Sequence, residues 1–563
     1  MEATLHHLPS SDRVVVRLPA WTPGSYLIRD YVRWLDSLTV HQAGRLLPVD
    51  RIDLAAWRFD CVPCQPLEIR YGIQATELTV RTCHADGDHA FLALAGVALR
   101  IEEERWSPHR LEVVLPPGWR SFVALPRDGE GWMARDYDQL VDSPVEAGPH
   151  PCHDFSVAGV PHRWVTWGDD LPGRDPEWLA DVEKVCLACC RLMGEEGPPS
   201  PDPYLFVLHL LERGYGGLEH DQATVLQYGR RDLARPEGRR RLLQLVVHEY
   251  LHRWNVKLLR PAELTPIDYD RAPLVPSLWF AEGVTSYVDQ LLPVAAGCAT
   301  EEELLDDLGS DLSRFLLTPG RRVQSLRQSS LEAWVKLYRA DAHSADSQVS
   351  YYLKGAVLAL VLDLHLRRHG SALSTVLKGL WRSHGRWRRG YREEDLIAAF
   401  AGQDPELAHL LPAWLESTED PDLDGHLAEV GLKLVPDPSP QRSMGWQVEA
   451  EPHGTLRLRR VSRGGPAQEG GLAVADELIA IDGQRVRQLD DLAWLLDDGR
   501  LGSEERLHGA SRPLPVLFCR DGRVRTAMVR PGAPEPERWR LRIEPSGPAD
   551  AAARRARWLS LEP

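Results

Sequence analysis

A run with helical spacing and two histidines one turn apart places the strongest constraint on this chain. Residues 239–256 read RRRLLQLVVHEYLHRWNV, without Gly or Pro and with apolar residues at helical intervals. His248 and His252 are four residues apart, so a helix carries both imidazoles on one face. Two neutral imidazoles in this arrangement can bind one Zn²⁺ ion, and Glu249 lies close enough to take a proton from a water that the metal activates.

Zinc needs one more protein ligand and an open coordination position for chemistry. Glu282 is the best candidate, because its apolar stretch LWFAEGVTSY can form a second helix beside the first. The alternative is a chance HExxH match on a surface helix. The apolar residues before His248 favour a buried helix instead, and buried His or Glu side chains need partners. We therefore expect His248, His252 and Glu282 to bind a metal.

The length and composition exclude several classes of protein. A chain of 563 residues is too long for a single core and is expected to form about three or four domains. The net charge of −16 argues against non-specific nucleic-acid binding. No apolar run is long enough to span a membrane, and the first residues lack the pattern of a signal peptide. The chain has nine cysteines. Two C-x-x-C spacings occur, at Cys61/Cys64 and Cys186/Cys189, but neither has a second such pair nearby, so we expect reduced thiols and a cytoplasmic location.

Four segments of different pattern follow one another along the chain. Residues 1–165 contain short β-branched runs separated by Pro and Gly turns, which predicts an all-β domain. Residues 166–424 are mainly helical in pattern, residues 425–545 return to β-like runs, and residues 546–563 form a Pro-, Ala- and Arg-rich tail. The predicted fold class is multidomain α+β. The clearest elements are predicted strands at 13–18, 67–71, 78–81, 111–115 and 204–211, and predicted helices at 176–194, 350–369 and 490–496.

One stretch of the predicted β domain has an unusual composition. Residues 18–33 read LPAWTPGSYLIRDYVR, which combines Pro, Gly and aromatic residues with two basic residues around an acid. The stretch can be a tight packing corner, or it can reach toward a neighbouring site. The residues alone leave both interpretations open.

Taken together, these motifs resemble a known family. HEYLHRWNVKLLRP followed by LWFAEGVTSY, with LPAWTPGSYLIRDY upstream, resembles the M61 glycyl aminopeptidase family of zinc peptidases. Residues 462–486, SRGGPAQEGGLAVADELIAIDGQRV, resemble the core of a PDZ domain, which that family usually carries at its C-terminus. The resemblance covers nearly the whole chain. It implies an N-terminal all-β domain, a thermolysin-like, mostly helical zinc peptidase domain, and a C-terminal PDZ domain.

The resemblance also implies the roles of the metal-site residues. His248, His252 and Glu282 match the family's zinc ligands, with one Zn²⁺ per chain, and Glu249 matches its catalytic glutamate. The spacer between His252 and Glu282 is longer than in thermolysin, and the family is similar in having a long spacer.

GGLEH, residues 216–220, resembles the G-x-M-E-N motif of related M1 aminopeptidases. The resemblance implies that Glu219 binds the free α-ammonium of the substrate, while the backbone at Gly216 and Gly217 hydrogen-bonds an extended peptide. This chain departs from the motif at Leu218 and at His220, where Asn is usual. The alternative is a plain solvated loop.

Tyr352-Leu353-Lys354-Gly355 resembles the Y-x-K-G motif of M1 enzymes. The resemblance implies that the Tyr352 hydroxyl stabilises the oxyanion formed during peptide hydrolysis, and Tyr351 is the second choice. Two aromatic residues that open an apolar helix can also be simple core residues.

These observations predict a zinc aminopeptidase that acts on peptides with a free N-terminus. The resemblance suggests small first residues, Gly or Ala. The alternatives are a zinc endopeptidase, which needs no ammonium anchor, and a non-catalytic protein that binds peptides through its PDZ domain. That domain can take a C-terminal peptide by strand addition, and Val430-Gly431-Leu432 is a weak match to its carboxylate-binding loop.

Overall fold

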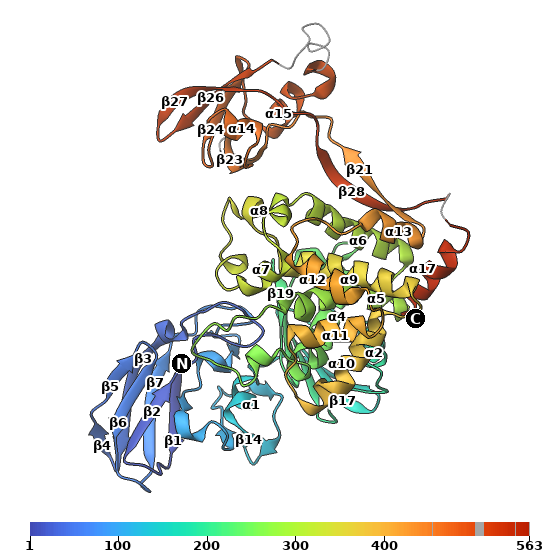
Figure 1. The fold of residues 1–563 in the computed structure, drawn as a ribbon. Helices are drawn as coiled ribbons and strands as arrows, with labels where there is room; N and C mark the ends of the chain where they lie inside the picture. The colour runs from blue at the N-terminus through green and yellow to red at the C-terminus, as the bar shows by residue number, and fades with distance from the viewer. Residues whose placement is uncertain (453, 502–511, 546–547, 562–563) are drawn as a thin grey trace. The chain divides into compact units, whose positions relative to one another are not determined.

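The computed structural model describes residues 1–452, 454–501, 512–545 and 548–561. The chain divides into two compact units (Figure 1). The first comprises Met1–Glu301, His365–Leu410 and Ala556–Pro563, and the second comprises Glu302–Leu364 and Leu411–Arg555. Helices and strands occur in both, which confirms the predicted α+β class. Within the described residues, no helix combines the length and the apolar content needed to cross a lipid bilayer.

Two four-stranded antiparallel sheets begin the first unit, with strand orders β1-β7-β3-β4 and β10-β2-β6-β5. Alternate residues such as Val14 and Val16 are buried, as expected for a sheet with one face in the core. The predicted strand at 78–81 is wrong, because the Thr79 and Thr82 hydroxyls bond to each other and to the local backbone in a loop. The elements are β1 Glu2–His7, β2 Arg13–Arg17, η1 Tyr31–Trp34, β3 Leu35–Gln42, β4 Arg45–Leu47, β5 Asp50–Asp53, β6 Ala56–Asp60 and β7 Leu67–Ile73.

A three-stranded and a four-stranded sheet follow, with orders β11-β14-β13 and β12-β15-β9-β8. In the second of these, β8 and β9 form a short antiparallel hairpin. The predicted strand at 111–115 is present only at its first residue, the end of β11. The elements are β8 His84–Ala85, β9 Ala90–Leu92, η2 Leu94–Gly96, β10 Arg100–Ile101, η3 Glu102–Glu104, β11 His109–Leu111, β12 Arg120–Val123, β13 Arg127–Asp128, β14 Gly131–Ala134, α1 Tyr137–Val141 and β15 Val145–Gly148.

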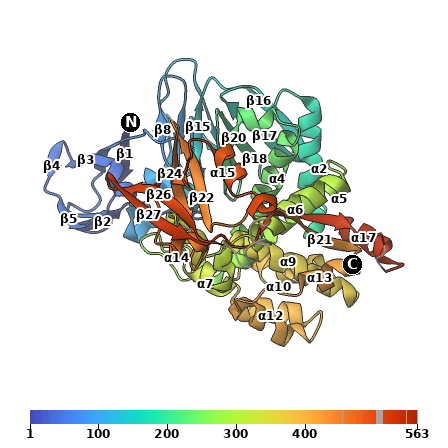
Figure 2. The same ribbon diagram turned by 90° about the horizontal axis from the view of Figure 1, so that it is seen from above.

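A five-stranded mixed sheet of order β16-β17-β18-β20-β19 forms the centre of the peptidase region. Strands β17, β18 and β20 are parallel, and β19 is an antiparallel edge strand. Helices α2 and α4 pack on this sheet and on each other (Figures 1 and 2). Helix α2 begins where predicted, since the Asp175 carboxylate accepts a bond from the Glu177 N–H at 2.9 Å. The elements are β16 Cys152–Val157, β17 Val160–Trp167, α2 Pro176–Leu192, β18 Tyr204–Leu211, β19 Tyr215–Glu219 and β20 Ala223–Gly229.

The other helices of the first unit include two π-helical turns that the sequence did not predict. The first, η4, follows α4, and the second, η6, precedes α5. Both turns contribute to the candidate site. The elements are α3 Arg230–Leu233, α4 Gly238–Leu251, η4 Arg253–Leu258, η5 Ala262–Leu264, η6 Trp279–Val284, α5 Thr285–Ala295, α10 Leu373–Ser383, η9 Gly385–Trp387 and α11 Glu393–Ala401.

The second unit combines helices with the PDZ region. Helix α9 confirms the long apolar helix predicted at 350–369. The other helices of this unit precede α9 or follow residue 406. The elements are α6 Glu301–Leu316, η7 Pro319–Arg322, α7 Leu326–Leu331, η8 Leu337–Arg339, α8 Ser344–Ser347, α9 Tyr351–Arg368, α12 Leu407–Glu416 and α13 Leu423–Glu429.

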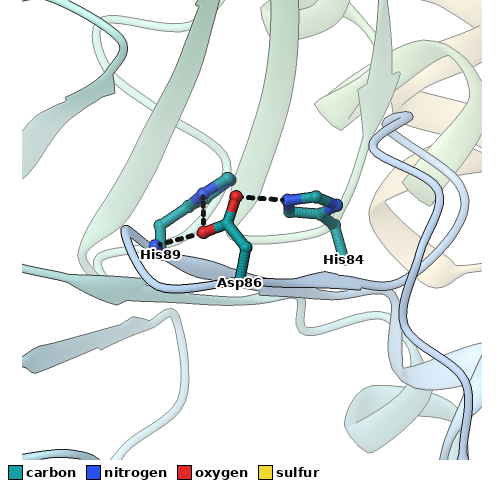
Figure 3. A group of neighbouring side chains, drawn as sticks. All are labelled: His84, Asp86 and His89. Carbon is teal, nitrogen blue, oxygen red and sulfur yellow. Dashed lines mark hydrogen bonds and ion pairs between the residues drawn. The ribbon is translucent and has the colours of Figure 1, made fainter.

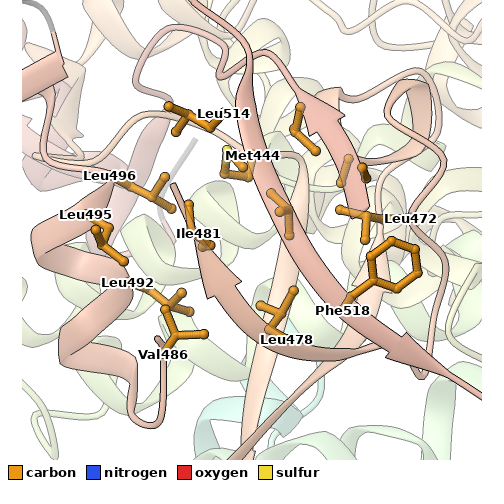
Figure 4. Packing of buried hydrophobic residues seen from close by; sticks show 14 of the residues in the cluster. Met444, Leu472, Leu478, Ile481, Val486, Leu492, Leu495, Leu496, Leu514 and Phe518 are labelled. Atoms are coloured by element: carbon orange, nitrogen blue, oxygen red, sulfur yellow. The ribbon is translucent and has the colours of Figure 1, made fainter. Parts of the chain in front are cut away.

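The PDZ region forms a sheet of order β22-β23-β24-β26-β27, with β25 paired to β24. Its core includes Leu478, Ile481 and Phe518, all at most 3% exposed (Figure 4). Asp482 and Gly483 have positive φ values of 51° and 74°, which suit the tight hairpin turn that pairs Ile481 with Gln484. The elements are β22 Trp446–Glu451, β23 Thr455–Val461, α14 Pro466–Glu469, β24 Glu477–Ile481, β25 Gln484–Arg485, α15 Leu489–Leu495, β26 Leu514–Arg520 and β27 Arg523–Val529.

Two features at the margins of the PDZ region differ from the sequence analysis. Residues 430–432 lead into β21 Leu432–Pro438, which pairs with β28 Pro536–Ile543 in a separate two-stranded sheet, so their match to a carboxylate-binding loop is wrong. The predicted tail contains helix α17 Ala551–Leu559, whose Trp558 is fully buried and donates to the Tyr287 hydroxyl at 2.7 Å. The composition of residues 497–513 also indicates an irregular polar loop, of which residues 502–511 lie outside the described residues.

Candidate active site

Helix α4 and the turn η6 bring three predicted metal ligands together. His248 lies in the last turn of α4, His252 ends that helix, and Glu282 lies in η6. The Glu282 Oε2 atom is 3.5 Å from His248 Nε2 and 3.2 Å from His252 Nε2. Ligands about 2.0–2.1 Å from a tetrahedral zinc ion lie about 3.3 Å from one another. The two distances from Glu282 are therefore those expected between ligands of one zinc ion, and all three ligand atoms lie within 4.8 Å of one another.

Each imidazole is oriented by a hydrogen bond through its other ring nitrogen. His248 Nδ1 bonds to the carboxylate of Asp289, on α5, at 2.8 Å. His252 Nδ1 bonds to the backbone oxygen of Asn255 at 2.6 Å. An N–H donated from Nδ1 leaves Nε2 unprotonated and directed at the metal position, which is the usual outer-shell arrangement of metal-binding histidines. These contacts support the fit to zinc.

The π-helical turn η4 explains how one residue supports two ligands. Asn255 departs from helical geometry, with φ −98° and ψ 76°, and this kink turns its carbonyl toward His252. Its side-chain amide donates to the backbone oxygens of Phe280 and Ala281, at 3.1 and 3.2 Å, just before Glu282. Sequence reasoning missed both Asn255 and Asp289. The only available signal for Asp289 was its position two turns after Glu282 on an apolar helix.

The catalytic candidate Glu249 lies against the edge strand β19. A Cβ atom built on Gly217 would overlap the Glu249 carboxylate, so the missing side chain makes the space that Glu249 occupies. Glu249 is 5% exposed, and its Oε2 has no hydrogen-bond partner in the described parts of the chain. Burial raises the pKa of Glu249 to about 7, and the charges of Glu219 and Glu282 act in the same direction.

Burial alone would raise the pKa of Glu282, but the adjacent His252 and His248 outweigh it and hold the pKa at about 2. Glu282 is therefore a carboxylate, the form that can bind a metal. Glu249, by contrast, is poised to exchange a proton near neutral pH. The two buried glutamates thus have environments suited to different roles.

Glu219 lies on the same face of β19 as Gly217, two residues away. One carboxylate oxygen of Glu219, one of Glu249 and one nitrogen of His252 lie within 4.8 Å of one another. Glu219 is 3% exposed, and its Oε1 lacks a hydrogen-bond partner among the residues that the structure describes. A buried carboxylate with a free oxygen can bind a cation at this position.

The unusual segment at residues 18–33 reaches this site. Gly24 faces Glu219 so closely that a built Cβ would lie 2.5 Å from both carboxylate oxygens. The segment is held by the Trp21 indole, which donates to the Asp268 oxygen at 2.8 Å. Beside Glu219 is a cavity of about 20 Å³, lined in part by Trp21, Gly24, Tyr26 and Val256. Of the two interpretations of this segment, the structure supports the one in which it reaches a neighbouring site.

Strand β19 lies at the edge of its sheet. Among the described strands it pairs with β20, and Gly216 has open space where a side chain would be. Arg81 donates to the Gly217 oxygen at 3.2 Å and so contacts this strand from the N-terminal region. His220, the departure from the M1 pattern, bonds instead to Asp142 at 3.3 Å.

The oxyanion candidate Tyr352 lies in the first turn of α9, in the second unit. Its hydroxyl is 3.1 Å from that of Tyr338, and the Tyr351 hydroxyl is 3.2 Å from the same atom. Tyr351 is fully buried, whereas Tyr352 is partly exposed, which favours Tyr352 as the residue able to meet a substrate. Its role stays a prediction.

Family models match three parts of the chain: the peptidase M61 N-terminal domain at residues 1–149, the M61 glycyl aminopeptidase at residues 241–358, and a PDZ domain at residues 457–507. Among solved structures, an aminopeptidase N family protein from Idiomarina loihiensis is 28% identical, with a TM-score of 0.90 over 99% of this chain and 97% of its own. The comparison with curated proteins finds no match.

Two further structures are more distant. Legionella pneumophila aminopeptidase A in complex with aspartic acid is 12% identical, with a TM-score of 0.45 over 81% of this chain and 50% of its own. Yeast LTA4 hydrolase in complex with bestatin is 14% identical, with a TM-score of 0.46 over 74% of this chain and 65% of its own. The family matches and the Idiomarina structure support a peptide hydrolase. The chain belongs to the M61 glycyl aminopeptidase family and carries a PDZ domain after its peptidase region.

Proposed function

We propose that this chain is a zinc-dependent aminopeptidase that removes a small N-terminal residue, Gly or Ala, from peptides. The proposal rests on one observation above all. Glu219 is a buried carboxylate with an unbonded oxygen, next to the catalytic candidate Glu249 and the ligand candidate His252. A site of this kind suits the free α-ammonium group that distinguishes an aminopeptidase substrate from an internal peptide bond.

His248, His252 and Glu282 would hold the zinc ion. When bound, zinc supplies Lewis acidity, which lowers the pKa of a coordinated water and polarises the carbonyl of the scissile bond. The carboxylate of Glu282 offsets part of the ion's charge. Asp289 and Asn255 keep the two imidazoles in the orientation that metal binding requires.

Glu249 would act as the general base and then as the general acid. Its raised pKa, about 7, lets the carboxylate take a proton from water and return it to the leaving amine at neutral pH. The missing side chain of Gly217 leaves room for the Glu249 carboxylate against β19.

Glu219 would determine where the substrate stops. A peptide that lies along the edge of β19 and pairs its ammonium with Glu219 can present only its first peptide bond to the metal. The cavity beside Glu219 is small, about 20 Å³, which supports a preference for small first residues. Tyr352 is proposed to donate a hydrogen bond to the oxyanion.

The first test is hydrolysis of Gly- and Ala-p-nitroanilide, each compared with its N-acetylated form, with zinc measured in the same sample. We expect cleavage of the free-amine compounds only. Equal cleavage of the acetylated forms would contradict the ammonium anchor and favour a zinc endopeptidase. If the zinc-loaded protein cleaves none of these compounds, the result would favour a protein that binds peptides through its PDZ domain.

The matched variant for this test is Glu249→Gln, which keeps the side-chain size but cannot accept a proton. We expect kcat to fall by about 10²–10⁴-fold, the usual contribution of general acid–base catalysis, while zinc binding is retained. Full activity in this variant would exclude Glu249 as the general base.

A further inference from the structure

A second set of metal-binding side chains lies in the β8–β9 hairpin of the first unit. His84 begins β8, Asp86 lies in the turn, and His89 precedes β9. Figure 3 shows the Asp86 carboxylate between the two imidazoles. One ligand atom of each residue lies within 4.8 Å of the other two. None of these residues has a part in the proposed peptidase reaction.

The distances in this set are comparable with those of the catalytic set, although each histidine here faces a different oxygen of the carboxylate. His84 Nε2 is 3.0 Å from Asp86 Oδ2, and His89 Nδ1 is 3.7 Å from Asp86 Oδ1. The corresponding distances in the catalytic set are 3.2 and 3.5 Å. Both pairs of values lie close to the separation of about 3.3 Å expected for neighbouring ligands of a tetrahedral zinc ion.

His89 provides an independent indication of a bound ion. The side chain is 0% exposed, yet neither ring nitrogen has a hydrogen-bond partner within the part of the chain that the structure describes. Its ring stacks on Trp167, with 3.9 Å between the ring centroids, so the imidazole is held in one orientation with Nδ1 toward Asp86. A buried polar group without a partner is costly, and a metal ion would satisfy this one.

The residues behind His89 extend the site into the sheet. Glu146, on β15, accepts from His209 Nε2 at 2.8 Å and from His150 Nε2 at 2.7 Å. Ligand atoms of His89, Glu146 and His209 also lie within 4.8 Å of one another.

We propose that His84, Asp86 and His89 bind a second divalent transition metal ion, of the zinc type, which clamps the β8–β9 hairpin. Two imidazoles and one carboxylate favour zinc and its neighbours over Mg²⁺ or Ca²⁺, which prefer oxygen ligands only. Glu146 offers a further oxygen on the inner side of His89. His89 is buried, His84 is half-buried and Asp86 is exposed, so the proposed site lies at the surface with its inner side in the core.

The clamp would act on the loop that leads into the hairpin. That loop carries Arg81, which donates to the Gly217 oxygen on β19, and its Leu78 oxygen accepts from Gln227, on β20, at 3.2 Å. A metal ion at His84 and Asp86 would fix the end of this loop at the hairpin. It would therefore stabilise the contact of the loop with the strand on which the proposed substrate lies.

The test is the metal content of the purified full-length protein, loaded with Zn²⁺, dialysed and measured by mass spectrometry. We expect about two zinc ions per chain, one for each ligand set. His84→Gln should lose about one of them, and His252→Ala should lose the other. The matched control is His153→Gln, since His153 forms a similar half-exposed pair with Asp170 at 2.8 Å but belongs to no three-residue ligand set among the described residues. It should keep both ions.

A second measurement covers the case in which His84→Gln does not fold. His252→Ala, loaded with Co²⁺, should show the visible absorption bands of cobalt bound by nitrogen and oxygen ligands. Absence of these bands, or a wild-type chain whose zinc is lost entirely in His252→Ala, would overturn the proposal. Either result leaves the aminopeptidase proposal intact, because that proposal is tested by activity and by the catalytic ion alone.

Discussion

Substitution of Gly24 by Ala tests the role of Glu219 without altering the carboxylate itself. Gly24 has a φ of +85°, and a Cβ added there would lie 2.5 Å from both oxygens of Glu219. That distance is shorter than van der Waals contact allows, so either the segment or the Glu219 side chain must move. The buried position of Glu219 leaves it little room to move without giving up its place beside the catalytic residues.

The expected effect has two parts. The left-handed backbone conformation costs a residue with a Cβ about 1–2 kcal/mol, which lowers the free energy of unfolding. Displacement of the carboxylate weakens a charge-assisted hydrogen bond to the substrate ammonium, worth about 1.5–3 kcal/mol. At 1.36 kcal/mol for each factor of ten, we expect kcat/KM for Ala-p-nitroanilide to fall by about 10- to 150-fold.

Gly118→Ala is the matched control, because Gly118 has the same φ of +85° but nothing within 4 Å of a built Cβ. It should show the loss of stability without the loss of kcat/KM. The assay should include two competitive inhibitors, alanine hydroxamate and propionohydroxamate, which differ only in the amino group. In Gly24→Ala, the inhibition constant of the first should rise and that of the second should stay constant.

Two results would refute this reasoning. If Gly24→Ala weakened both inhibitors equally, the residue would affect the metal site in general and not the ammonium. If Gly24→Ala kept full activity, Glu219 would not need its present position, and the ammonium would bind elsewhere.

Three further predictions address the metal site, the second unit and the PDZ core. Asp289→Asn should weaken zinc binding by about 10–100-fold, as the loss of an outer-shell partner usually does, and competition with a chelator would measure it. Leu478→Ala should lower the unfolding free energy of the PDZ region by about 2–5 kcal/mol in denaturant titrations, because Leu478 is 2% exposed. Burial lowers the pKa of Lys354 from 10.5 to about 8, so between these values the unfolded chain binds a proton that the folded chain does not. Unfolding free energy should therefore rise with pH across that window by up to about 3 kcal/mol, and Lys354→Met should show a smaller rise; an equal rise in both proteins would contradict the assignment.

The parts of the site that follow from local geometry could be predicted from the sequence. The spacing of His248 and His252 is a property of any α-helix, and the apolar residues before them indicate burial. Glu282 was predicted from the character of its stretch and from the family resemblance. The supports of these ligands could not be predicted in the same way. Asn255 acts only because the helix changes to a π-helical turn after His252, and no residue in HRWNV signals that change.

Contacts between distant segments were beyond the reach of sequence patterns. Gly24 and Glu219 meet because the N-terminal region packs against the peptidase sheet, and nothing in the local sequence of either residue encodes the other. The same holds for the second metal set. His84, Asp86 and His89 lie close together in the chain, but nothing in their local sequence indicates that His89 also lies near Glu146 and His209, which come from other strands.

The metal site and the features proposed to select the substrate should respond differently to substitutions. The proposed zinc ligands and Glu249 come from one stretch of local structure, α4 to α5, so changes elsewhere in the chain leave the metal geometry largely unaffected. The features proposed to select the substrate depend instead on the 18–33 segment and on Arg81, both of which contact β19 from the N-terminal region. Substitutions in that region should therefore alter which first residue is accepted while zinc binding is maintained. A clamp at the β8–β9 hairpin would couple this selection to a second metal ion, because the same loop carries Arg81.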